Sequence, residues 1–109
     1  MPYDPGLAQR LEDFLEDKKG FQQKKMFGGI GWLLNGNMCV GVYKDWLIIR
    51  VGEEKAASIF KKKHVKPMDI TGKPMKGWAM VAPKGYESDS DLAGFVDLAT
   101  GFVKKLPPK

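Results

Sequence analysis

The chain has 109 residues and a formal net charge of +5, with 43% hydrophobic and 28% charged side chains, a globular composition that excludes a disordered chain. No apolar run approaches the roughly 18 to 20 residues that cross a bilayer, and the acidic first segment is unlike a secretory signal, so we expect a cytoplasmic protein with no membrane partner. The length predicts a single domain over residues 1–109.

The first predicted element is a helix that begins at Asp4 and Pro5, a pair typical of a helix cap and a first helical turn. Its apolar residues recur at helical spacing and form one face: Leu7, Leu11, Phe14 and Leu15. Lys19 and Gly20 should end this helix, because the period of the sequence then changes from helix to strand.

Two strands are predicted next, at residues 24–27 and 30–34. They flank Gly28 and Gly29, a pair that permits a bulge or a sharp bend where a Cβ atom would clash. These glycines lie between strands, whereas a phosphate-binding glycine loop leads from a strand into a helix, so they do not indicate a nucleotide site.

The strongest local signal is the dipeptide Asn35-Gly36, which supplies the positive φ angles of a two-residue type I′ turn. Residues 30–34 should therefore pair antiparallel with residues 37–43. A second reversal then leads into a strand at residues 46–51, so the sequence predicts a meander.

A short helix is predicted over residues 53–62, with four residues available for a buried face: Ala56, Ala57, Ile59 and Phe60. The periodicity is then lost over residues 63–77, where prolines and glycines interrupt the chain. We expect a long structured loop there, in which residues 68–70 are extended as a short edge strand.

A further strand is predicted at residues 78–82, followed by a turn at residues 83–85. The last element is a helix, with Ser88 and Asp91 as a capping box. Its apolar residues recur at helical spacing: Leu92, Phe95, Val96, Ala99, Phe102, Val103 and Leu106. Together these elements predict an α+β fold of two layers, in which an antiparallel sheet packs against helices.

Catalytic chemistry finds little support in the sequence. Cys39 is the only cysteine and lies in an apolar strand, which favours a buried residue over a reactive one. His64 is the only histidine and lies among lysines, which favours a solvated side chain. A zinc site needs three or four protein donors, so no metal and no cofactor are expected, and we do not expect an enzyme.

The best candidate site is a basic window over residues 61–76, which holds six lysines and one acid, Asp69. Its formal charge of +5 equals that of the whole chain, so the remaining residues balance. A charge concentrated in this way attracts anionic partners, although lysines also occupy ordinary solvated surfaces. Met and Trp residues lie between the lysines, as at many interaction sites. The binding candidates are Lys61, Lys62, Lys63, Lys66, Lys73, Met75, Lys76 and Trp78.

Several spaced motifs resemble the N-terminal domain of the TfoX/Sxy family. They are Lys24, Lys25, Met26, Phe27, Gly28 and Gly29; Asn35, Gly36, Asn37 and Met38; Lys66, Pro67 and Met68; and Gly72, Lys73, Pro74, Met75, Lys76, Gly77 and Trp78. The resemblance extends over residues 3–109 and implies a bacterial protein with a two-layer fold similar to secretion-chaperone-like and YjbR-like domains. In this family motif we expect a structural role for Met26, Phe27, Gly28, Gly29, Asn35 and Gly36.

The resemblance also bears on function. Full-length TfoX proteins regulate natural competence, are thought to act with a cyclic-AMP receptor protein at promoters, and carry a C-terminal domain similar to helix-hairpin-helix modules. The chain is expected to be a stand-alone N-terminal domain, because no such second domain follows. The family has no established catalytic residues, so the resemblance transfers none.

Three hypotheses follow for the function. The first is a non-enzymatic interaction or regulatory module, linked to transcription or competence, with a protein as its partner. The alternative is sequence-nonspecific nucleic-acid binding through the lysine-rich window, whose six lysines would make affinity for duplex DNA fall with salt by a logarithmic slope of about five. The third is a small-molecule enzyme. The sequence leaves open whether the protein is a homodimer.

Overall fold

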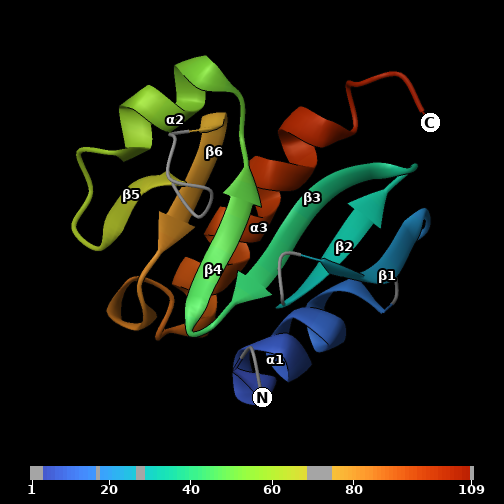
Figure 1. Cartoon of the computed structure of the whole chain (residues 1–109), viewed down its shortest axis with the longest axis horizontal. Helices are drawn as coiled ribbons and strands as arrows, with labels where there is room; N and C mark the ends of the chain where they lie inside the picture. Colours follow the sequence, from blue (N-terminus) through green and yellow to red (C-terminus); the bar gives the residue numbers. More distant parts are fainter. Residues whose placement is uncertain (1–3, 17, 27–28, 69–74, 109) are drawn as a thin grey trace.

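Three helices lie on one side of a six-stranded antiparallel sheet in the computed structural model, which describes residues 4–16, 18–26, 29–68 and 75–108 (Figure 1). The elements in chain order are α1 (Pro5–Leu15), β1 (Phe21–Met26), β2 (Gly29–Leu34), β3 (Asn37–Tyr43), β4 (Trp46–Arg50), α2 (Glu53–Ile59), β5 (Val65–Met68), β6 (Met75–Val81), a 3₁₀ turn η1 (Pro83–Gly85) and α3 (Asp89–Val103). The strand order across the sheet is β1-β2-β3-β4-β6-β5. The predicted α+β fold with an antiparallel sheet packed against helices is confirmed.

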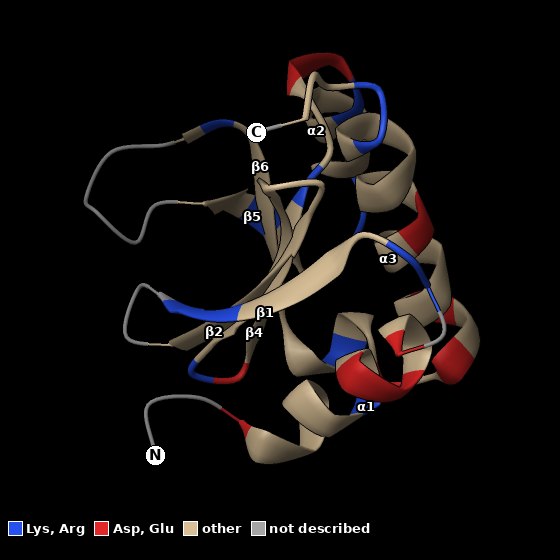
Figure 2. Cartoon of the chain, turned by 90° about the vertical axis from the view of Figure 1, so that its right-hand side faces the viewer, with Lys and Arg blue, Asp and Glu red and all other residues tan. Residues whose placement is uncertain are grey.

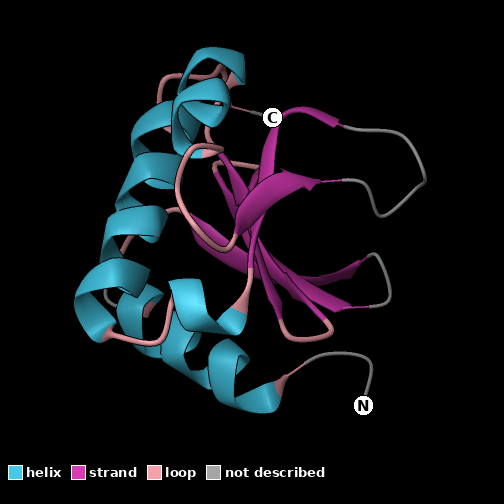
Figure 3. Ribbon diagram, turned by 90° about the vertical axis from the view of Figure 1, so that its left-hand side faces the viewer, coloured by secondary structure: helices cyan, strands magenta, loops and turns pink. Residues whose placement is uncertain are grey.

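The main core lies between the helices and one face of the sheet (Figure 3). Its strand residues form rows of cross-strand partners, such as Ile30, Val42, Leu47, Val81 and Val65, each paired with the next. All three helices add buried side chains to this core, among them Leu11 of α1, Ile59 of α2 and Val96 of α3. The helices therefore cover a single face of the sheet.

The first helix has the predicted cap. The Asp4 carboxylate accepts hydrogen bonds from the backbone N–H groups of Gly6 (2.8 Å) and Leu7 (3.4 Å). Pro5 occupies the first helical position, where its missing N–H group costs nothing. Leu7, Leu11 and Leu15 are buried as expected.

The predicted hairpin between β2 and β3 is confirmed. Asn35 and Gly36 have φ angles of 53° and 86°, and Leu34 pairs directly with Asn37. The Asn37 side chain is itself buried and donates a hydrogen bond to the carbonyl oxygen of Pro107 (3.0 Å). This bond ties the hairpin to the end of the chain.

The predicted extents of the strands near the two edges of the sheet were wrong. β1 begins at Phe21, three residues before the predicted start, because it pairs with β2 over its whole length. The expected loop at residues 63–77 is too long, since β5 already forms at residues 65–68 and β6 begins at Met75. β5 is the edge strand, where Pro67 is tolerated because only one side of the strand needs hydrogen-bond donors. Of the predicted extended segment 68–70, residues 69–70 lie outside the described residues.

The predictions for α2 and α3 differ in accuracy. α3 has its predicted cap, with the Ser88 hydroxyl accepting from the backbone N–H of Asp91 (3.1 Å). α2 ends at Ile59 and contacts the core through Ala56 and Ile59, while Ala57 is exposed. Ala57 was predicted to be available for the buried face, but it is rotated by about 100° from Ala56 and lies outside the stripe that Ala56 and Ile59 form. Within the described part of the chain, no helix is both long and apolar enough to span a membrane.

A pair of glycine substitutions tests the hairpin turn. Gly36→Ala should lower the free energy of unfolding by about 1–2 kcal/mol, because alanine is strained at a left-handed φ angle. Gly94→Ala is the matched control: Gly94 is exposed in α3 with open space around its Cβ position, so alanine should raise stability by about 0.4–1 kcal/mol. Urea unfolding measures both, and a stability change of the same sign in the two variants would contradict the turn geometry.

Candidate functional site

The sheet face turned away from the helices carries a second, smaller apolar cluster. Ile48, Met68 and Met80 are 1%, 0% and 3% exposed, although no described helix covers them. Four half-buried side chains pack around them: Tyr43, Trp46, Met75 and Trp78. We call this side of the sheet the open face. Its buried residues are protected by neighbours on the same face, and the rings form the outer surface.

One row of cross-strand partners crosses the whole open face. From edge to edge it reads Lys24, Gly31, Gly41, Ile48, Met80 and Lys66. Strand side chains alternate between faces, and the adjacent row contains the core residues Ile30, Val42 and Leu47. The row therefore points away from the helices, with one exposed lysine at each end.

Three aromatic rings of the open face each have a cation nearby. Lys66 Nζ lies 4.7 Å from the ring centroid of Trp46. The Arg50 guanidinium lies 5.4 Å from the centroid of Trp78 and 6.0 Å from that of Phe102 in α3, so Arg50 sits at the end of β4 between the open face and the helices. Lys44 Nζ lies 5.5 Å from the centroid of Tyr43. These distances are in the range of cation–π contacts.

The acidic residues that the structure describes lie outside the strands (Figure 2). The six strands contain five basic residues, Lys24, Lys25, Arg50, Lys66 and Lys76, and no Asp or Glu. The described acidic residues lie on helices, in their caps or in the turns between elements. The sheet layer thus carries a formal charge of +5, which equals the net charge of the chain. The residues outside the strands comprise 13 basic and 13 acidic side chains, which balance, so the strands hold the positive excess of the chain.

The predicted basic window is divided between the two sides of the sheet. Lys62 lies toward the helices, with Nζ 5.9 Å from the ring centroid of Phe95 in α3, whereas Lys66 lies over Trp46 on the open face. Lys61, Lys63 and Lys76 are exposed, and Met75 and Trp78 join the cluster of the open face. Lys73 lies outside the described residues. The structure therefore brings Lys66, Met75 and Trp78 together and separates them from Lys62.

Sequence reasoning missed four residues of the open face: Lys24, Tyr43, Trp46 and Arg50. Their signal was the alternation within β4, where Trp46, Ile48 and Arg50 share one face opposite the core residues Leu47 and Ile49. The prediction missed this signal because it followed charge along the sequence to a single window. The cations and rings of the open face come instead from five different strands and the turn between β3 and β4.

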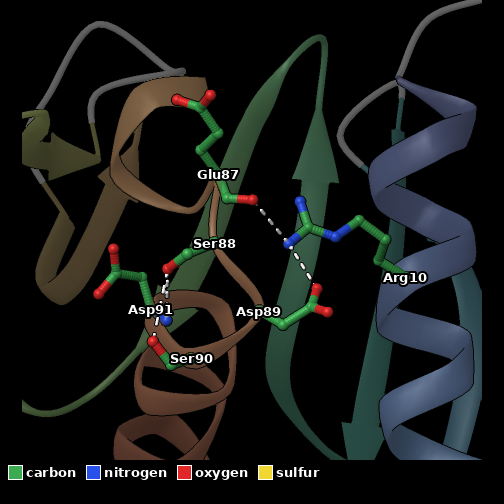
Figure 4. Close-up of polar contacts among 6 residues, drawn as sticks. All are labelled: Arg10, Glu87, Ser88, Asp89, Ser90 and Asp91. Atoms are coloured by element: carbon green, nitrogen blue, oxygen red, sulfur yellow. Dashed lines mark hydrogen bonds and ion pairs between the residues drawn. The ribbon is translucent and has the colours of Figure 1, made fainter.

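A polar cluster on the helix side has a structural role (Figure 4). Arg10 Nη2 of α1 donates to the carbonyl oxygen of Glu87 (3.2 Å) and to Asp89 Oδ1 (3.1 Å), which holds α1 against the start of α3. The Asp89 side chain is 87% exposed, so this ion pair contributes little to stability. A cavity of about 220 Å³ beside it is lined by Arg10, Asp13, Phe14 and Asp89. Its charges already face each other, which leaves no obvious anionic or cationic site.

The groove between α2 and α3 is larger but has mixed charge. Two connected hollows of about 470 and 380 Å³ share Val51, Lys55 and Phe102 in their walls. Glu54 lines one hollow and Asp97 the other, so acids and lysines alternate along the groove. Within the described residues, no group of three or more His, Cys, Asp or Glu side chains could hold a metal ion.

Comparison with known protein families decides the family. The model of the TfoX N-terminal domain matches residues 13–103, which is most of the chain. The chain belongs to the TfoX N-terminal domain family. Comparisons with curated proteins and with solved structures gave no match.

In this TfoX N-terminal domain Asn35 and three described motif glycines, Gly29, Gly36 and Gly77, lie at turns or close backbone contacts. Asn35 and Gly36 form the hairpin turn, and a Cβ atom at Gly29 would collide with the carbonyl oxygen of Val42. Gly77 has a φ angle of 83°, and its carbonyl oxygen accepts from the N–H groups of Val51 (2.9 Å) and Gly52 (3.0 Å). Met26 is the last residue of β1, while Phe27 and Gly28 lie outside the described residues.

The two candidate nucleophile and base residues are far from reactive. Cys39 is 0% exposed, and burial raises the pKa of its thiol to about 11, against smaller lowering effects of the Thr100 hydroxyl and the Arg50 charge. His64 is exposed, at a positive φ angle of 70° in the turn before β5. Burial and the charges of Asp4 and Asp45 raise the pKa of Tyr86 to about 12, and its hydroxyl donates to the Asp45 carbonyl oxygen (2.7 Å).

Thiol alkylation tests the burial of Cys39. With a pKa of about 11, roughly one thiol in a thousand is ionised at pH 8, against about a quarter for an ordinary cysteine. Iodoacetamide should therefore react at least a hundredfold more slowly with the native protein than with the protein unfolded in urea. The native rate should rise about tenfold per pH unit between pH 8 and pH 10, because the thiolate fraction grows in that proportion below the pKa. Equal rates at pH 8 would show that the thiol is accessible.

Proposed function

We propose that this TfoX N-terminal domain is a non-enzymatic binding module that holds an anionic macromolecule on the open face of its sheet and acts in transcriptional regulation, as the competence regulators of its family do. The observation that carries the proposal is the charge separation: strands with five basic and no acidic residues, beneath helices and turns that hold the described acids. On the open face this positive charge comes from Lys24 and Lys66 at the two ends of the row, and it attracts a polyanion there.

The side chains of the open face are more typical of a binding surface than of an ordinary solvated sheet face. A solvated sheet face normally carries polar side chains in alternation, whereas here half-buried Trp46, Trp78 and Met75 surround a buried apolar centre. Aromatic and methionine side chains are enriched at interaction sites. Cations at both ends of the row then provide attraction, and the rings provide contact area.

A binding role without catalysis is supported by the state of the ionisable groups. The two described groups with shifted pKa values are Cys39 and Tyr86, and each is shifted mainly by burial. Cys39 lies in the core, and Tyr86 is engaged in a backbone hydrogen bond. Neither lies in a cleft with a second group of complementary chemistry, which an acid–base pair requires.

Charge reversal on the two sides of the sheet tests the proposal. Lys24→Glu with Lys66→Glu removes the lysines at both ends of the open-face row, and Lys61→Glu with Lys62→Glu makes the same charge change beyond α2. On a heparin column the first pair should elute at clearly lower salt than the control pair, because heparin is a polyanion that contacts the open face. All four lysines are exposed, so both proteins should keep the native fold.

Two results would contradict the binding face. The wild-type protein could pass through heparin at low salt, or the two charge-reversed pairs could elute together. The regulatory part has its own test in the host: the open-face pair should change the transcript profile as a gene deletion does, and the control pair should leave it unchanged.

A further inference from the structure

The rings and cations of the open face form a repeated unit. Trp46 has Lys66 at 4.7 Å and Trp78 has Arg50 at 5.4 Å, in both cases with the cation near the ring. A third and weaker copy is Tyr43 with Lys44 at 5.5 Å. Each unit therefore offers a flat aromatic surface and a positive charge within a few ångströms of one another.

A nucleotide has the complementary pair of groups, a flat base and a negative phosphate. We infer that the open face binds single-stranded nucleic acid, with bases stacked on Trp46 and Trp78 and phosphates contacted by Lys66 and Arg50. Proteins that bind single strands combine aromatic stacking with a cationic surface in this way. The inference rests on the proposed function, since it names the partner of the same face.

The spacing of the units suits a chain that runs along β4. Trp46 begins β4, and Trp78 is the cross-strand partner of Arg50, four residues further on. At about 3.4 Å per residue this places the two rings about 14 Å apart along the strand. Ile48 and Met80 lie between them as a buried apolar floor. Tyr43 is the cross-strand partner of Trp46 and widens the strip at one end.

The contacts within the free protein do not block such binding. Lys66 is exposed and Trp46 is half-buried, so a phosphate and a base can reach both side chains from solvent. Base stacking on an aromatic side chain is stronger than an exposed cation–π contact. A base can therefore replace the cation over the ring, while the cation keeps an electrostatic partner.

Other anionic partners fit these observations less well. A duplex keeps its bases paired and stacked inside, so it could use the cations but not the rings. An acidic protein segment would satisfy the charge, but it gives no reason for a ring beside each cation. The Lys61–Lys63 turn, favoured by charge along the sequence, has Lys62 near Phe95 of the buried core and offers no comparable strip.

Fluorescence anisotropy with a labelled dT12 oligonucleotide tests the inference on the full chain. The wild-type protein should bind dT12 at low salt and lose affinity with a logarithmic slope of about 1.4, from roughly 0.7 for each phosphate contact of Arg50 and Lys66. Trp46→Ala with Trp78→Ala should weaken binding at least tenfold. Phe14→Ala is the matched control, because Phe14 is a half-buried ring on α1, on the helix side, and its loss should leave binding unchanged.

Competitors then identify the partner class. Unlabelled dT12 should displace the probe better than a 12-base-pair duplex or poly-L-glutamate at equal charge. Equal competition by these three, or unchanged affinity of the tryptophan variant, would overturn the inference and leave a general polyanion site, as proposed above. Retention on heparin without binding of dT12 would also overturn it and favour an acidic protein partner. Loss of both heparin and dT12 binding would remove the proposed function together with the inference.

Photo-crosslinking covers the case in which the double tryptophan variant fails to fold. A dT12 containing 5-bromouracil is irradiated with the unmodified protein, and the adducts are located by mass spectrometry. Adducts at Trp46, Trp78 or Tyr43 are the expected result. Adducts confined to residues 61–64 or to α3 would place the strand on the other side of the sheet and overturn the inference.

Discussion

The whole structure depends on one constraint: three helices cover one face of the sheet, and the other face must protect its own apolar side chains. Packing against helices buries the first face over the length of every strand. On the second face Ile48, Met68 and Met80 are buried, and Trp46, Trp78 and their neighbours pack against them. Each such side chain contributes about 1.5–3 kcal/mol when fully buried, so the rings stabilise the fold as well as forming its surface. Stability and the proposed binding thus rest on the same residues.

Charge follows the same division. The described acidic residues lie on helices, in their caps or in turns, together with an equal number of basic ones over the whole chain, and the charged residues of the strands are all basic. The glycines at the centre of the open-face row have a packing reason: a Cβ atom at Gly41 would lie 2.8 Å from the Met38 methyl group and 2.9 Å from the Ile30 carbonyl oxygen. The middle of the row is therefore filled by the protein itself, and the rings over β4 and β6, with the cations around them, remain as the contact surface.

Local signals predicted the fold well, and long-range pairing limited the prediction of the site. Asp4, Asn35-Gly36 and Ser88 act through hydrogen bonds and φ angles within a few residues, so the sequence alone placed α1, the hairpin and α3. β1 and β5 owe their extents to partners elsewhere in the sheet, which local periodicity does not report. Long-range pairing also decides which of the predicted site residues share a face. Lys62 and Lys66 are four residues apart but lie on opposite sides of the sheet, while Trp46 and Lys66 are distant in sequence and in contact.

The central claim is that the open face is the binding face, and the three tryptophans test it directly. Trp46 and Trp78 lie on the open face, whereas Trp32 is 2% exposed in the main core and its indole donates to Glu12 Oε2 (3.1 Å). In a two-dimensional NMR titration with dT12, the indole N–H signals of Trp46 and Trp78 should shift and that of Trp32 should stay in place. Shifts confined to the backbone amides of residues 61–64 and α3, with both open-face indoles unmoved, would contradict the account.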